Sequence, residues 1–176
     1  MHSLGFRTDL MLRRLAGATV EDRGDHLLVR TPANPTFYWG NFLLFANPPA
    51  PGDGTRWLQL FADELPDASH VAIGVDGTAG DLGAAQELVE AGLAAEVNTV
   101  LTADRLGQPF RDVGDAVLRP LHSDDDWRQA LELRSLVYGG DTPAYRVFVS
   151  RQLEEARVLA DTGCAVYVGA FVDGVL

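Results

Sequence analysis

The chain has 176 residues, enough for one domain of ordinary size or two small ones. Hydrophobic residues make up 47% of it and charged residues 22%, a composition that excludes a disordered or collagen-like protein. With 14 basic and 25 acidic residues the formal net charge is −11, and because such a surface repels phosphate backbones we expect no nucleic-acid partner.

The absence of lysine and the single cysteine exclude or disfavour several kinds of catalytic site. All the basic residues are arginines, which excludes a Schiff-base lysine or a phosphate-binding lysine. Cys164 is the sole cysteine, and we interpret it as a small buried residue rather than a nucleophile or metal ligand. No apolar run reaches the roughly 18–20 residues of a membrane span, and arginines interrupt residues 1–15, where a secretory signal would be apolar. We therefore expect a cytoplasmic protein with no membrane partner.

The hydrophobic pattern of the first hundred residues predicts alternating helices and strands. Residues 37–45 are aromatic and apolar almost without a break, which is typical of a central strand covered on both faces. Asp81 is a candidate N-cap and Gly92 a candidate C-cap of one helix. The predicted elements are a helix at 6–15, strands at 18–21 and 26–30 joined by a hairpin turn at 22–25, the strand at 37–45, a helix at 55–65, a strand at 70–75, a helix at 82–91 and a strand at 94–102. This order predicts an α/β layer in which the strands at 37–45, 70–75 and 94–102 are neighbours.

The second half of the chain follows a predicted linker at 106–115, which contains two glycines and a proline. Ser123 and the three aspartates after it are typical of a helix start. The predicted elements are a strand at 116–121, that helix up to residue 138, a helix at 144–162 and a strand at 165–172. Asp173-Gly174 then signals a hairpin turn, but only two residues follow it. We expect the chain to stop inside a fold, and the strand at 165–172 to pair with the first half or with a second copy in a homodimer.

Three stretches of the sequence resemble one known family. The Leu-Arg-Pro-Leu sequence at 118–121, the acidic helix start after it, and the Tyr-Val-Gly-Ala-Phe-Val-Asp-Gly stretch at 167–174 resemble the opening of the GCN5-related N-acetyltransferase superfamily. The segment at 84–93 is similar to a late helix of the same fold. The resemblance implies an α/β protein of the acyl-CoA N-acyltransferase type, a mixed sheet flanked by helices, in a tandem arrangement. It implies a degenerate first domain at 1–105, the linker at 106–115, and the N-terminal part of an incomplete second domain at 116–176. One permuted fold built from both halves is the alternative.

The resemblance also implies an activity, the transfer of an acetyl group from acetyl-CoA to an amine of a small molecule or peptide. Family members bind acetyl-CoA at a Gln/Arg-x-x-Gly-x-Gly/Ala loop that follows the central strand and opens the next helix, where amides hold the pyrophosphate. In the corresponding segment Gly52 and Gly54 keep the glycine pair, and with Thr55 they are the candidate cofactor-binding residues. Pro49 replaces the Gln/Arg, and the carboxylate of Asp53 lies where phosphates would bind. A plain turn that caps a helix is the competing interpretation.

The same resemblance identifies no catalytic residue in the first domain. In the family a carboxylate takes the amine proton and a tyrosine protonates the leaving thiolate, but residues 37–46 contain no carboxylate and residues 82–92 contain no tyrosine. We therefore expect this chain to be a truncated and inactive form of an N-acetyltransferase. A non-catalytic scaffold or dimerisation domain of an acetyltransferase is the alternative.

Other residue groups favour structural roles. The four histidines have no metal-ligand spacing, so we expect no metal site, and we interpret His70 as a strand-edge residue. The aspartates at 124–126 could bind a cation or cap a helix, and we favour the cap. The aromatic residues at 37–39 could line an acceptor pocket or pack in the core, and we favour the core.

Overall fold

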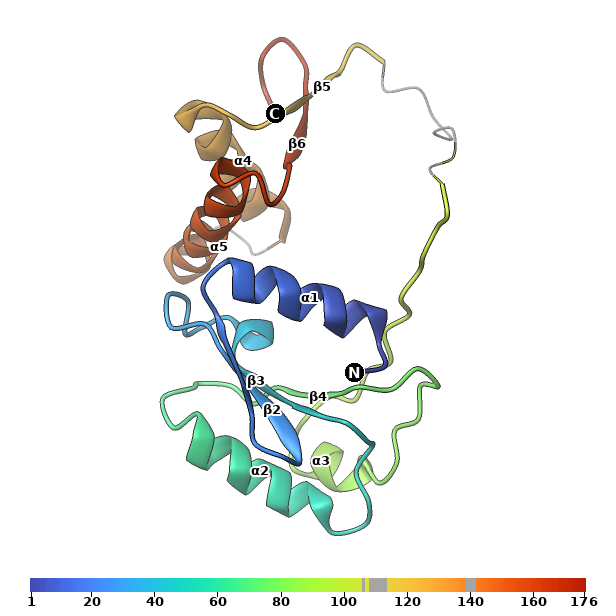
Figure 1. The fold of residues 1–176 in the computed structure, drawn as a ribbon. Helices are drawn as coiled ribbons and strands as arrows, with labels where there is room; N and C mark the ends of the chain where they lie inside the picture. The colour runs from blue at the N-terminus through green and yellow to red at the C-terminus, as the bar shows by residue number, and fades with distance from the viewer. Residues whose placement is uncertain (106, 108–113, 139–141) are drawn as a thin grey trace. The chain divides into compact units, whose positions relative to one another are not determined.

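The computed structural model describes residues 1–105, 107, 114–138 and 142–176, which form two compact units, Met1–Leu101 and Thr102–Leu176. We call them unit 1 and unit 2 and describe each by itself. Unit 1 contains a four-stranded mixed sheet and unit 2 a two-stranded sheet, both with helices, so the fold class is mixed α/β (Figure 1). Most of the linker predicted at 106–115 lies outside the described residues.

Unit 1 is built on the sheet order β1-β2-β3-β4. Strands β1, β2 and β3 pair antiparallel with one another in that order. Strand β4 pairs parallel with β3, and α2 connects these two strands. Its elements are α1 (Leu4–Leu15), β1 (Thr19–Asp22), β2 (His26–Arg30), the 3-10 turn η1 (Tyr38–Gly40), β3 (Phe42–Phe45), α2 (Asp53–Glu64), β4 (Ile73–Val75) and α3 (Gln86–Glu90).

The central strand β3 is buried on both faces, as its apolar run predicted. Phe42 and Leu44 pack with Leu10 of α1, whereas Phe45 packs on the other face with Trp57 of α2. The rings of Phe45 and Trp57 stack at 3.8 Å between centroids. Successive side chains of a strand point to opposite faces, so one short strand anchors the helices on both sides (Figure 1).

Three sequence predictions in unit 1 are corrected. Residues 37–41 do not extend β3. The side-chain amide of Asn41 donates to the carbonyls of Asn34 and Phe37 and so holds this segment in a turn. The strand at 94–102 is not formed; its apolar residues do not alternate, and Leu101 is 87% exposed. Of the helix predicted at 82–91, only the part that forms α3 is helical. Asp81 does not cap α3; its side chain accepts from the Gly83 amide in a turn.

Unit 2 contains β5 (Val117–Pro120), α4 (Asp124–Tyr138), α5 (Pro143–Asp161) and β6 (Val168–Phe171). Its core joins Trp127 of α4, Ala156 of α5 and Phe171 of β6. Strand β6 pairs antiparallel with β5 of the same unit, which corrects the expectation of a partner strand in the first half; pairing with a second copy stays a prediction. Cys164 is an exposed free thiol, not a buried residue.

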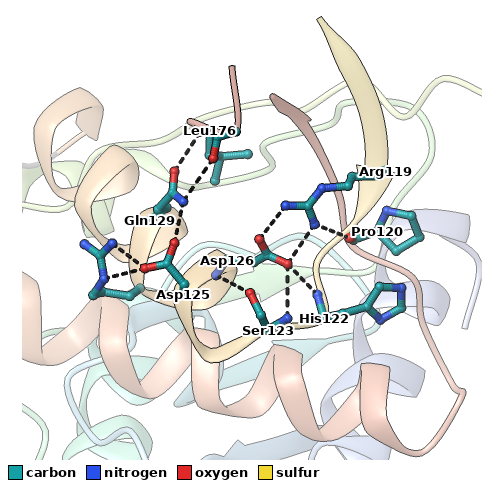
Figure 2. Close-up of polar contacts among 10 residues, drawn as sticks. Arg119, Pro120, His122, Ser123, Asp125, Asp126, Gln129 and Leu176 are labelled. Atoms are coloured by element: carbon teal, nitrogen blue, oxygen red, sulfur yellow. Dashed lines mark hydrogen bonds and ion pairs between the residues drawn. The ribbon is translucent and has the colours of Figure 1, made fainter. Parts of the chain in front are cut away.

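The Asp-Gly turn after β6 forms as predicted. Asp173 and Gly174 both have positive φ, and the turn is closed by a bridge between Val172 and Val175. The amide of Leu176 then donates to the side-chain oxygen of Gln129 at 2.8 Å (Figure 2). A side chain of α4 thus holds the returning arm of this hairpin.

Candidate functional site

The segment that resembles a cofactor loop connects β3 to α2. Gly52 is the N-cap of α2 and has a φ of +89°, a conformation that favours glycine. Its amide donates to Glu87 Oε1 at 2.6 Å, and the Gly54 amide donates to Glu87 Oε2 at 3.1 Å. One carboxylate from α3 therefore accepts from two amides in the first turn of α2.

This position is the one in which a helix N-terminus binds an anion. The first amides of a helix have no intrahelical partner, and the helix dipole favours negative charge beside them. Glu87 is half-buried and supplies that charge from within the protein. A pyrophosphate that used the amides of Gly52 and Gly54 would have to displace it.

Close contact between α2 and α3 requires the second glycine. A Cβ atom on Gly54 would lie 2.6 Å from the Cβ of Glu87, well inside van der Waals contact. The glycine pair of the loop is thus explained by packing: Gly52 makes the turn and Gly54 admits α3. Thr55, the third candidate cofactor residue, is exposed.

Asp53 adds a second negative charge at the same helix end. Its Oδ2 accepts from the Ala50 amide at 2.9 Å, and its Oδ1 accepts from the Arg56 guanidinium. The Ala50 hydrogen bond, followed by that of Arg56, lowers the pKa of this carboxyl below its usual range. Asp53 therefore stays ionised at neutral pH, paired with Arg56.

Main-chain contacts close the end of the sheet at which α/β folds bind ligands. Such ligands lie beyond the carboxyl ends of the parallel strands. Here the Asp76 amide donates to the carbonyl of Phe45 at 2.8 Å, which joins the ends of β3 and β4. The Ala84 amide donates to the carbonyl of Pro49 at 2.7 Å, and a Cβ on Gly83 would lie 2.5 Å from that oxygen. The loops after the two strands thus pack against each other.

An Asp-His pair that the sequence analysis missed lies at the start of β2. His26 Nδ1 lies 2.7 Å from Asp25 Oδ1, and Asp25 Oδ2 accepts from Arg56 of α2 at 2.8 Å. The Arg56 hydrogen bond, followed by that of His26, lowers the pKa of Asp25. The pair has the form of a general base, but His26 is buried, with only 5% of the residue exposed. Its role is to fasten the β1–β2 turn to α2; the adjacency of Asp25 and His26 was the available signal, but Arg56 lies thirty-one residues away.

The remaining candidates in unit 1 separate into core and surface. His70 is buried before β4, where Nε2 contacts the carbonyl of Asn41 at 3.0 Å and the ring stacks on Tyr38. Phe37 is buried as predicted, whereas Tyr38 and Trp39 are about half exposed and so are not core residues. These two aromatic side chains therefore lie on the surface of unit 1.

The three aspartates of unit 2 begin α4, and Figure 2 shows Asp125 and Asp126 bonded to different partners. Asp126 accepts two hydrogen bonds from the Arg119 guanidinium and one each from the amides of His122 and Ser123. Ser123 Oγ in turn accepts from the Asp126 amide, so the predicted cap is confirmed. The Arg119 hydrogen bonds, followed by that of the His122 amide, hold the pKa of Asp126 far below its usual range.

The described residues show neither a metal-binding cluster nor a membrane-spanning helix. No three His, Cys, Asp or Glu side chains gather there in a way that could hold a metal ion. In the same part of the chain, none of the helices has both the length and the apolar character that crossing a membrane requires. Comparison with protein-family models, with curated proteins and with solved structures finds no match for this chain.

Proposed function

We propose that unit 1 is a non-catalytic scaffold domain of the acetyltransferase type. The observation that carries the proposal is the bond pair from the amides of Gly52 and Gly54 to the carboxylate of Glu87. In the family that this sequence resembles, the corresponding amides hold the cofactor pyrophosphate. Here an internal anion already satisfies them.

The proposed role is mechanical rather than chemical. The loops beyond β3 and β4 pack against each other, and in the Asp-His pair of unit 1 the His26 ring is buried while Asp25 is exposed and pairs with Arg56. A unit of this kind supplies a rigid body on which a catalytic partner packs. We place it in the cytoplasm, where the exposed thiol of Cys164 stays reduced.

A second candidate function is N-acetyl transfer from acetyl-CoA to the amine of a small molecule or peptide. The strand order favours it, since β2 and β3 are antiparallel and β3, α2 and β4 form a parallel crossover, as the resemblance implies for the cofactor-binding half of that fold. For this function the Glu87 side chain would have to leave the amides when acetyl-CoA binds.

Calorimetric titration with acetyl-CoA distinguishes the two functions. For a scaffold we expect no saturable heat from the native chain up to millimolar acetyl-CoA, and no release of CoA thiol when a polyamine or an amine-bearing peptide is added. Saturable binding that is lost in Gly54→Val would overturn the scaffold role and support the transferase. Gly77→Val is the matched control, because a Cβ at Gly77 meets open space.

A further inference from the structure

Helix α1 presents a stripe of exposed residues on the side away from the sheet. Leu4, Met11 and Leu15 are each about half exposed, and Arg7 and Arg14 are exposed between them. These five residues, which we call the basic stripe, recur at steps of three and four and so share one face of the helix. A shallow hollow of about 330 Å³ lies along this helix, lined by Met1, Arg7, Leu10, Met11, Arg14 and Leu15.

The arginines of the basic stripe are unusual in an acidic chain. Within the part of the chain that the structure describes, neither Arg7 nor Arg14 makes an ion pair or a side-chain hydrogen bond. By contrast Arg13, on the flank of the same helix, pairs with Asp9 at 3.4 Å. Two uncompensated cations that alternate with exposed apolar residues favour an acidic, apolar partner.

Helix α5 carries a stripe of the opposite charge. Val147 and Val158 are about half exposed, and Glu154 and Asp161 are exposed on the same face. We call these four residues the acidic stripe. Glu154 accepts only from Ser150 at 3.2 Å among the described residues, and Asp161 lies 3.8 Å from Arg157 Nε, so both carboxylates remain available.

The two stripes have the same spacing. Arg7, Met11 and Arg14 are separated by four and three residues, and so are Glu154, Val158 and Asp161. With a rise of 1.5 Å per residue the two charges of each stripe are about 10.5 Å apart along the helix. Parallel packing therefore places a carboxylate opposite each guanidinium and Val158 against Met11.

We propose that α1 of one copy of this chain packs against α5 of a second copy. Each copy offers both stripes, so a dimer with two-fold symmetry contains this contact twice. Packing of α1 on α1 is disfavoured because it brings the arginines of two basic stripes together. The apolar residues supply most of the attraction, and the four ion pairs of the dimer fix the register against a net charge of −11 on each copy. The proposal does not depend on the scaffold function of unit 1.

Sedimentation velocity of the full chain over a dilution series tests this dimer. We expect the native chain to dimerise at micromolar concentrations. The double reversals R7E/R14E and E154R/D161R should each weaken the dimer by at least about tenfold, because each places like charges in contact. The two variants change the net charge in opposite directions, so an effect of net charge alone would weaken one dimer and strengthen the other.

Mixing the two charge-reversal variants is the decisive experiment. One carries acid on both stripes and the other carries base on both, so their mixture should form a heterodimer of near-native affinity, and the quadruple variant should self-associate again. The control Arg105→Glu reverses an exposed arginine outside both stripes and should leave the dimer unchanged. A native chain that stays monomeric, a dimer that resists both reversals, or a mixture that fails to associate would overturn the proposal.

Discussion

Helices α2 and α4 each begin at a carboxylate, but the two carboxylates have different origins. At α4 the anion is Asp126, three residues after the capping Ser123, and its partners lie within seven residues of it (Figure 2). At α2 the anion is Glu87, thirty-three residues after Gly54 and on another helix. The first cap forms with its own helix, whereas the second forms only when α3 packs on α2.

This difference separates a cap made within one helix from a cap made between two helices. The cap of α4 contains a serine, an aspartate and an arginine that satisfy one another, so nothing is left for a ligand. The N-terminus of α2 keeps two glycines and no side-chain cap of its own, and a remote carboxylate fills it. Four changes to the two caps test this contrast, and we give them from the largest expected effect to the smallest.

Removal of the local cap has the largest expected effect. Asp126→Ala leaves the Arg119 guanidinium and the amides of His122 and Ser123 without their acceptor. We expect hydrogen exchange at the start of α4 to accelerate strongly and unit 2 to melt several degrees lower, while β2 and β3 keep their protection. Asp124→Ala is the control, because that side chain is exposed and, among the described residues, pairs only with Arg157 at the surface. Equal protection in the two variants would show that the Asp126 network does not hold the helix.

Filling the space between α2 and α3 has the next largest effect. Gly54→Ala brings a Cβ to 2.6 Å from that of Glu87 and should lower the free energy of unfolding of unit 1 by about 1–3 kcal/mol, measured by native-state hydrogen exchange at β3. Gly77→Ala meets open space and should change it by less than about 0.5 kcal/mol. If Gly54→Ala is as stable as that control, the close contact of α2 and α3 is wrong.

Loss of the remote cap alone is milder. Glu87→Gln removes the charge but keeps the size of the side chain, and we expect unit 1 to lose about 1 kcal/mol, the usual value of a helix cap. Glu90→Gln removes the same charge from the same helix without affecting the amides of α2, and should have little effect. The same exchange experiment compares the two variants, and a larger loss in Glu90→Gln would contradict the assignment of the cap.

The last prediction concerns the pH dependence of the Asp126 cap, which leaves stability at neutral pH unchanged. Because the pKa of Asp126 is lower in the folded than in the unfolded chain, its contribution is complete above the unfolded pKa of about 4 and is lost as the pH falls through the folded value. Carboxyl-carbon NMR should show Asp126 still ionised at pH 3, where exposed aspartates titrate. A midpoint near 4 for Asp126 would contradict this cap.

Local features of the fold could be predicted from the sequence. The bounds of β2 agree with the predicted strand at 26–30, and Gly92 ends α3 with a positive φ as expected. Ser123 caps α4 through contacts with its immediate neighbours. Each of these features depends on residues close together in the chain, so the pattern contains the necessary information.

Features that depend on remote partners were not predictable in this way. The sequence marks the glycines at 52 and 54 as candidate cofactor-binding residues, but it does not predict that Glu87 accepts from their amides, since nothing local links Glu87 to α2. The aromatic residues at 37–39 are typical of a buried strand, yet the side-chain amide of Asn41 holds residues 37–41 in a turn. Residues 94–102 have apolar side chains, but they do not pair with the edge strand β4 and they remain irregular.

Amide NMR of Gly52 and Gly54 tests most directly whether Glu87 fills the anion position of α2. In the native chain these two amide signals should not move when acetyl-CoA is added to millimolar concentration, whereas Glu87→Gln should shift both and Glu90→Gln should shift neither. Saturable movement of the Gly52 and Gly54 signals on addition of acetyl-CoA to the native chain would contradict the account and show that this helix end binds a ligand.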